Sequence, residues 1–120
     1  MSSPPRNRCI EVEQVGKISV VKFTRSEFLD DESIEMIGSQ LFGYVDRLGV
    51  RQMVLNFAGV ERMASLMLGK IMALHRKLKA VGGRLVLCGV DPEIYWVFET
   101  LRLPKLLCFC KDEQEALQAF

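Results

Sequence analysis

The chain has 120 residues, which is the length of one domain. Hydrophobic residues make up 49% of it, enough for a core that needs no disulfide or structural metal. Sixteen Lys and Arg residues against fifteen Asp and Glu leave a net charge of +1. The two signs are interspersed, which argues against nucleic acid or an anionic membrane as a partner. Apolar runs such as 94–98 are far shorter than the roughly 20 residues of a membrane span.

The sequence predicts a short N-terminal arm followed by a single domain. Residues 1–8 are polar and lack the apolar stretch of a secretory signal, so we expect a flexible arm followed by one domain over 9–120. The four cysteines lie in or beside apolar runs, as reduced thiols packed in a core do. These features predict a cytoplasmic protein.

The periodicity of apolar residues alternates between that of strands and that of helices. The predicted elements are strands 9–15 and 17–23 around Gly16, a helix after Leu29, strand 52–57, a loop over 58–64, a helix from Ser65, strand 84–88, a helix after Asp91, strand 106–110 and a last helix after Asp112. Each strand from Gln52 onward precedes a helix, which predicts parallel strands joined by right-handed crossovers. We therefore expect an α/β fold with a mixed sheet, an N-terminal antiparallel hairpin and about four helices.

Capping residues and apolar stripes refine these helices. Asp30 or Asp31 is predicted to begin the first helix, and Gly49 to end it, after a stripe that runs to Leu48. Ser65 is predicted to cap the second helix, and a double glycine ends it. In the third helix the predicted buried stripe is Ile94, Val97, Phe98 and Leu101. The last helix should dock through Ala116, Leu117 and Phe120.

The usual arrangements of catalytic and metal-binding residues are missing from the sequence. His75 is the one histidine, and it fits a half-exposed position on a helix. Cys108 and Cys110 form a C-x-C pair that could hold a metal, but a second pair is lacking, so buried thiols are the preferred interpretation. Gly82-Gly83 closes a helix and lacks the spacing of a phosphate loop. We expect no catalytic residue, no metal and no cofactor.

Two features point to binding. Ser65 lies where a loop turns into a helix, so a phosphate on it would meet unsatisfied amides and the positive end of the helix dipole; the alternative is a purely structural cap. Tyr95 and Trp96 fall off the apolar stripe of their helix and should face solvent. They are candidates for an interface, or the Trp ring covers its own loop.

The segment V-L-N-F-A-G-V-E-R-M-A-S-L-M-L-G-K-I and the later G-G-R-L-V-L-C-G-V-D-P-E-I-Y-W-V-F resemble the corresponding parts of STAS domains, the fold of the anti-sigma factor antagonists. The resemblance covers residues 10 to 118. The family's D-S-S-G-L-G motif, whose first Ser is phosphorylated, falls on this chain from Ala64 to Gly69. Ser65 therefore matches the phosphorylated Ser, while Ala64, Leu66 and Met67 replace the Asp, the second Ser and the Gly.

The resemblance implies a regulatory protein-binding module and not an enzyme. Its partner would be an anti-sigma factor or kinase-like regulator, and phosphorylation of Ser65 would switch the contact. The alternative is a scaffold without a switch, which binds itself or a larger assembly, for instance as a homodimer, through Leu66, Met67, Met72 and the Tyr95-Trp96 pair. Of the first two, Leu66 is expected to be the more exposed. The predicted partner surface comprises Ala64, Ser65, Leu66, Met67, Tyr95 and Trp96.

Overall fold

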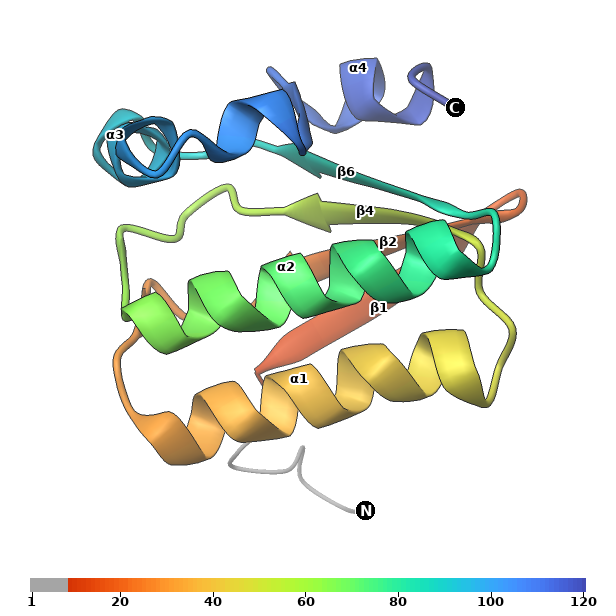
Figure 1. Ribbon diagram of the computed structural model, residues 1–120, viewed down its shortest axis with the longest axis horizontal. Helices are drawn as coiled ribbons and strands as arrows, with labels where there is room; N and C mark the ends of the chain where they lie inside the picture. The colour runs from red at the N-terminus through yellow and green to blue at the C-terminus, as the bar shows by residue number, and fades with distance from the viewer. Residues whose placement is uncertain (1–8) are drawn as a thin grey trace, which may run out of the picture.

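The computed structural model describes residues 9–120, and the predicted arm over 1–8 lies outside the described residues (Figure 1). The strands are β1 (Ile10–Val15), β2 (Ile18–Phe23), β3 (Glu27–Phe28), β4 (Gln52–Asn56), β5 (Arg62–Met63), β6 (Arg84–Cys88) and β7 (Cys108–Cys110). The helices are α1 (Asp31–Asp46), α2 (Ser65–Ala80), α3 (Pro92–Thr100), α4 (Glu113–Leu117) and the short 3-10 helix η1 (Leu103–Lys105).

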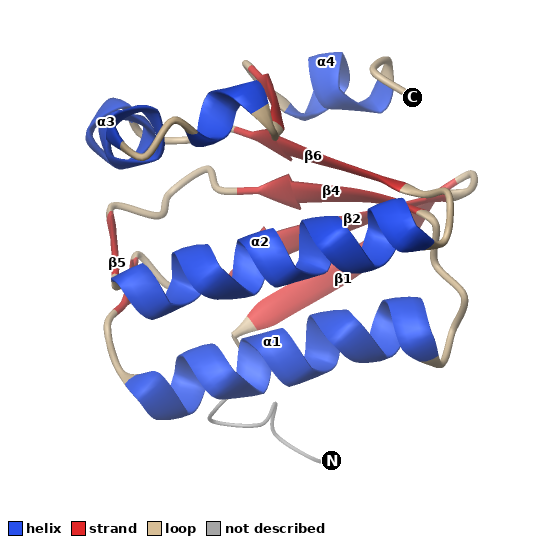
Figure 2. Cartoon of the chain, viewed as in Figure 1, coloured by secondary structure: helices blue, strands red, loops and turns tan. Residues whose placement is uncertain are grey.

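Five strands form the main sheet in the order β1-β2-β4-β6-β7. β1 runs antiparallel to β2, and every other neighbouring pair is parallel. The predicted mixed sheet with its N-terminal hairpin is therefore confirmed. A second sheet of two short parallel strands, β3 and β5, lies beside the start of α2 (Figure 2). This pair is a correction, because β5 falls within the segment 58–64 that the sequence predicts as loop.

Both faces of the main sheet are covered. Helices α1 and α2 lie side by side over one face, whereas the small α4 lies over the other (Figure 1). Val54 and Val86 face α4, and the alternate residues Leu55 and Leu87 join the larger core under α1 and α2. A strand covered on both faces is apolar without interruption, which is why β4 and β6 read as continuous apolar runs.

The first long helix begins at Asp30, one of the two caps that the sequence predicts. The Asp30 carboxylate accepts a hydrogen bond from the Ser33 amide at 2.9 Å. Hydrogen bonds from the hydroxyl and the amide of Ser33 lower the pKa of Asp30 to about 2, so the cap is ionised at any physiological pH. The C-cap is Arg47, and Gly49 lies two residues beyond it with a positive φ of 69°, a correction to its predicted role.

Three apolar side chains predicted to be buried are exposed instead. Leu48 is 70% exposed because α1 ends at Asp46 and the chain has already turned away from the core. Val97 and Leu101 are exposed because α3 is short and buries only Ile94 and Phe98. Two of the four residues in the predicted buried stripe of α3 are therefore buried.

The predicted strand 106–110 shrinks to β7. Arg102 adopts a left-handed conformation with φ 59°, which turns the chain out of α3 and into η1. η1 contains Pro104 and occupies the chain up to Lys105, so pairing with β6 begins only at Cys108. Cys108 and Cys110 are in a strand as predicted, and burial raises the pKa of Cys110 to about 11 and that of Cys88 to about 12. Both thiols therefore stay protonated at neutral pH.

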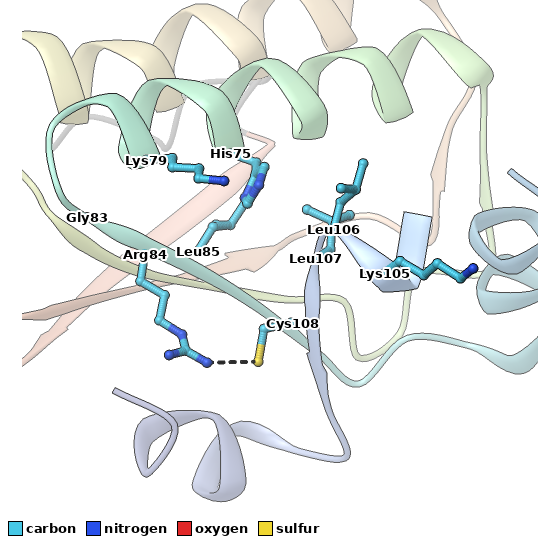
Figure 3. A pocket seen from close by; sticks show the side chains of 9 residues that line it. All are labelled: His75, Lys79, Gly83, Arg84, Leu85, Lys105, Leu106, Leu107 and Cys108. Carbon is cyan, nitrogen blue, oxygen red and sulfur yellow. Dashed lines mark hydrogen bonds between the residues drawn. The ribbon is translucent and has the colours of Figure 1, made fainter. Parts of the chain in front are cut away.

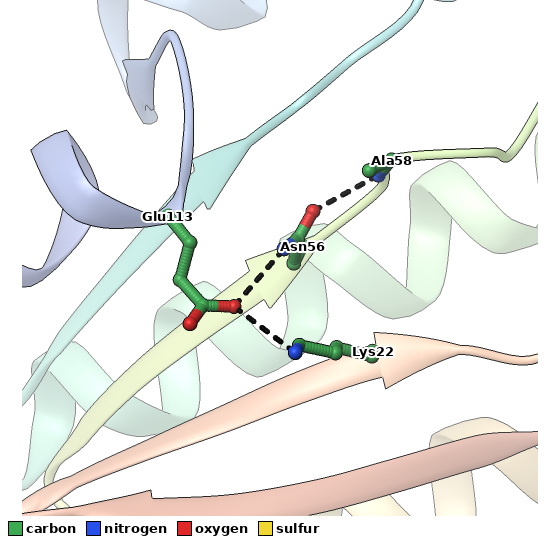
Figure 4. A network of polar contacts seen from close by, with 4 residues as sticks. All are labelled: Lys22, Asn56, Ala58 and Glu113. Atoms are coloured by element: carbon green, nitrogen blue, oxygen red, sulfur yellow. Dashed lines mark hydrogen bonds and ion pairs between the residues drawn. The ribbon is translucent and has the colours of Figure 1, made fainter.

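A polar network attaches α4 to the carboxyl ends of two strands (Figure 4). The Asn56 side-chain amide donates to Glu113 at 3.1 Å, and its oxygen accepts from the Ala58 amide at 3.0 Å. The Lys22 ammonium lies 3.7 Å from the same Glu113 carboxylate. Asn56 thus holds both the docked α4 and the first turn of the loop that leads to α2.

We expect replacement of Asn56 by Ala to lower the free energy of unfolding by about 1 to 2 kcal/mol, since a half-buried hydrogen bond to Glu113 and an exposed one from Ala58 are lost. Denaturant melts would measure this. Gln52, half-buried at the other end of β4, is the matched control, and its change to Ala should cost less than about 0.5 kcal/mol. Equal losses in the two variants would contradict a specific role for Asn56.

Within residues 9–120 no helix is long and apolar enough to cross a membrane. The same residues contain no group of three or more His, Cys, Asp or Glu side chains that could hold a metal ion. His75 is half-buried on α2, as its place in the sequence predicts.

Candidate partner-binding surface

The loop between β4 and α2 is held at several points before it reaches Ser65. The Phe57 amide donates to the Cys88 carbonyl at 2.9 Å, and Val60 is buried. β5 then pairs with β3, and the Ala64 amide donates to the Phe28 carbonyl at 2.9 Å. These backbone bonds fix the entry to α2, so Ser65 sits on a rigid support.

Ser65 is the first residue of α2 and its side chain is exposed. The N-cap is Ala64, with φ −76° and ψ 157°, and its side chain makes no capping hydrogen bond. The prediction that Ser65 caps the helix is wrong by one position, because the helix begins one residue earlier than the hydroxyl would require. The Ser65 hydroxyl is therefore not committed as a cap and is accessible from solvent.

The start of α2 differs electrostatically from the other helices of residues 9–120. The other three α-helices each have an Asp cap and at least one acidic residue in the first turn. α2 has neither, and two of its basic residues, Lys77 and Lys79, lie in its last turn. The positive end of its dipole is consequently uncompensated where the Ser65 hydroxyl is exposed, which favours an anion at this point.

We expect Ala64→Asp to raise the free energy of unfolding by about 1 kcal/mol, because a carboxylate at the N-cap would accept an amide hydrogen bond and offset the dipole. Ala64→Asn should retain most of the gain, since it caps without charge. Ser65→Ala should change stability by less than about 0.5 kcal/mol. Thermal or denaturant melts would measure all three, and a loss of about 1 kcal/mol in Ser65→Ala would restore Ser65 as the cap.

The two apolar residues after Ser65 have different environments. Met67 is 0% exposed and belongs to the main core, so its predicted place on the partner surface is a correction. Leu66 is half-buried and leans on that core with part of its side chain still accessible. Since neighbouring positions on a helix differ by about 100°, only one of the pair can face the sheet, and Leu66 is the more exposed of the two, as predicted.

The segment around β3 is bonded to the segment that leads into Ser65, through the Ala64 amide and the Phe28 carbonyl, and both segments carry charged and apolar side chains. Arg62 pairs with Glu27 at 3.2 Å across the two short strands, and Arg25 pairs with Asp30 at 3.3 Å. Leu29, which follows β3, is 47% exposed. These residues cannot be predicted from the sequence, because strands of two residues show no alternation of apolar and polar positions; the parallel pairing of β3 with β5 brings their segments together.

Tyr95 and Trp96 do not share one environment. The Tyr95 ring packs edge-on against Phe109, with ring centres 5.1 Å apart, so its predicted projection into solvent is a correction. Trp96 is 64% exposed, as predicted, and its helix neighbour Val97 and the C-cap Leu101 are exposed as well. α3 and the start of α2 lie at the same end of the molecule, where β4 and β6 end (Figure 1).

The model of the STAS domain family matches residues 10–116, nearly the whole chain. The chain belongs to the STAS domain family. The anti-sigma F factor antagonist of Paenibacillus polymyxa is 24% identical over 111 residues, which cover 92% of this chain and 93% of that protein. These findings confirm the resemblance drawn from the segments around Ser65 and Gly83.

Two solved structures of similar proteins have the same fold as this chain. The anti-sigma factor antagonist of Mycobacterium paratuberculosis superposes with a TM-score of 0.80 at 21% identity, covering 96% of each chain. The Bacillus cell fate determinant SpoIIAA in its phosphorylated form gives a TM-score of 0.72 at 24% identity, covering 91% of this chain and 96% of that one. The mixed sheet and four helices of this STAS domain thus match those of regulatory proteins.

Proposed function

We propose that this STAS domain is a cytoplasmic anti-sigma factor antagonist that binds a protein partner through the surface around Ser65. The observation that carries the proposal is the exposed Ser65 hydroxyl at the uncapped start of α2, at the position that matches the family's phosphorylated serine. The anti-sigma F factor antagonist among its relatives supports an anti-sigma factor or kinase-like regulator as the partner class. The surface comprises Leu29, Ala64, Ser65, Leu66 and Trp96.

Phosphorylation of Ser65 would switch this contact through charge. A phosphoryl group adds about −1.5 to −2 charges at pH 7, which the positive end of the α2 dipole stabilises in the unbound protein. The same charge must lose water when a partner covers Leu66 and Leu29, and that cost weakens the complex. A difference of about 2.7 kcal/mol corresponds to a hundredfold change in affinity, enough to exchange partners.

The intact mass of the protein isolated from its own host tests the switch. We expect a population that carries one phosphoryl group, which fragmentation assigns to Ser65. A protein that is never phosphorylated under growth and stress conditions, or one that is phosphorylated elsewhere, would contradict the switch. If the protein binds its partner but is never phosphorylated, the scaffold function is favoured.

The scaffold remains the second candidate because α3 exposes Trp96 and Val97, and its C-cap Leu101 is exposed as well. Aromatic side chains of this kind are frequent at the centre of permanent interfaces. In a scaffold these residues would contact a second copy of the chain or a larger assembly irrespective of the state of Ser65. Replacement of Trp96 by Ala would then abolish association, whereas Ser65→Asp would leave it unchanged.

A further inference from the structure

Three turns of the chain meet at the end of the molecule opposite to the start of α2. They are the β1–β2 turn, the connection from α1 to β4 and the connection from α2 to β6, which lie along the right-hand edge of Figure 1. Ile18, Gln52 and Arg84 lie in register on neighbouring strands, and the Arg84 amide donates to the Arg51 carbonyl at 2.8 Å. These backbone contacts fix the three turns side by side.

The charge of this end differs from that of the whole chain. Segments 16–17, 46–51 and 77–84, which we call the basic end, contain one acidic residue, Asp46, and it is paired with Lys77 at 2.9 Å. The other basic residues of these segments are all exposed: Lys17, Arg47, Arg51, Lys79 and Arg84. The two signs are interspersed along the sequence, but the fold gathers one sign here, so the argument from the sequence against an anionic membrane loses its basis.

Carboxylates gather at the opposite end. Asp30 and Asp31 lie at the start of α1, Glu61 lies in the loop before α2, and Asp91 and Glu93 lie at the start of α3. The net charge of +1 is therefore spread unevenly along the molecule. An anionic surface would attract the basic end and orient the other end away from itself.

Two apolar side chains protrude from the basic end. Leu48 is 70% exposed and Val81 is 44% exposed. Each lies where the chain leaves a helix and precedes a glycine with a positive φ, 69° at Gly49 and 76° at Gly82. The helix dipole accounts for cations at helix ends, but it gives no reason for exposed apolar side chains there. Apolar side chains beside Lys and Arg are the combination that binds the interface of anionic membranes.

The cations of the basic end do not converge on one point. Lys79 lies on the α2 side of the turn at Gly83, and Arg84 points the other way, toward the Cys108 sulfur (Figure 3). One small anion could not engage both, whereas a charged plane attracts every cation within a Debye length, about 10 Å at 0.1 M salt. The basic end also lacks the aromatic side chains on which nucleic acid bases stack.

We propose that the basic end binds the surface of a membrane rich in anionic phospholipids, with Leu48 and Val81 among the headgroups. Each Lys or Arg near such a surface strengthens binding about fivefold, so several of them give reversible attachment. Ser65 then faces away from the lipid and stays accessible. The inference does not depend on the proposed function, because the basic end shares no residue with the partner surface.

Flotation with lipid vesicles tests the proposal. We expect the protein to bind vesicles of phosphatidylglycerol and phosphatidylcholine in equal parts and to ignore pure phosphatidylcholine. Binding should be lost at about 1 M salt, where the Debye length is about 3 Å. The single tryptophan, Trp96, is on α3 at the opposite end, so its fluorescence should not shift when vesicles bind (Figure 1). In Leu48→Trp combined with Trp96→Phe, the emission should shift to the blue.

Matched charge variants separate a membrane site from general attraction. Lys17→Gln combined with Lys79→Gln should weaken binding to the anionic vesicles about 25-fold, at about fivefold for each charge. Lys70→Gln combined with Lys111→Gln removes the same net charge, but Lys70 lies about 13 Å before Lys79 along α2 and Lys111 follows β7. Binding of this second variant should change less than about twofold.

Matched leucine variants test the apolar contact. Leu48→Ser should weaken vesicle binding about tenfold, since the side chain would no longer leave water. Leu101→Ser alters another exposed leucine, at the C-cap of α3, and should bind as the unaltered protein does. Circular dichroism melts of the free variants verify that they are folded.

Four results would overturn the proposal. The first is the absence of binding to anionic vesicles at about 0.1 M salt. The second is an equal loss of binding in the two double lysine variants, which would reveal attraction by net charge alone. The third is a blue shift of Trp96 in the unaltered protein, which would show that α3 meets the lipid instead. The fourth is a protein that ignores vesicles and binds a single-stranded oligonucleotide through Lys17 and Lys79.

Discussion

Ser65→Asp is expected to weaken binding of the partner at least about tenfold, a change of roughly 1.4 kcal/mol. The added carboxylate is stabilised by the start of α2 in the free protein but loses its water when the partner covers Leu66 and Leu29. Ser65→Ala, which adds no charge, should bind within about twofold of the unaltered protein. Calorimetry with the partner purified from the host would measure both affinities.

Ser39 provides the control for this experiment. It is an exposed serine in the middle of α1, so Ser39→Asp makes the same chemical change on another helix. We expect no loss of affinity in Ser39→Asp, and a loss in Leu66→Ala whether or not the switch operates. Binding that responds to Leu66→Ala and ignores Ser65→Asp would contradict the switch and favour a permanent scaffold.

Phe28→Ala should lower the free energy of unfolding by about 3 to 5 kcal/mol, the largest effect we expect from a single substitution here. Phe28 is fully buried, packs edge-on against Phe23 with ring centres 5.5 Å apart and lies 4.9 Å beneath the Arg25 guanidinium. Its carbonyl also accepts from the Ala64 amide. The loss of its ring would therefore leave a cavity in the core directly under the proposed partner surface.

Phe42 is the matched control for the core position. It is half-buried on α1 and packs against the same core from the side, under the Lys77 ammonium. Phe42→Ala should cost roughly 1 to 2 kcal/mol. Denaturant melts would compare the two, and equal costs would contradict the view that β3 anchors the partner surface to the core.

Features set by neighbouring residues were predicted well from the sequence. Asp91 and Asp112 were predicted to precede their helices, and Asp30 was one of two candidate caps of the first, because an Asp side chain before an apolar period can accept hydrogen bonds from the first amides of a helix. The order of the elements from Gln52 onward followed from alternating periods, and it determined the parallel sheet. The resemblance around Ser65 located the candidate surface.

Features set by tertiary contacts were missed. Tyr95 packs against the ring of Phe109, a residue on β7 that is distant in sequence. The helical periodicity around Tyr95 gives no sign of this contact. β3 and β5 are too short to show an alternation of apolar and polar residues, so the sequence did not predict that these strands lead into Ser65.

Hydrogen exchange of the complex with the purified partner tests the central claim most directly, because it maps the contact without altering Ser65. The account predicts slower amide exchange at residues 27–30 and 62–69 on binding, and a loss of that protection when Ser65 is phosphorylated. Protection confined to α3, or protection unchanged by the phosphoryl group, would contradict it.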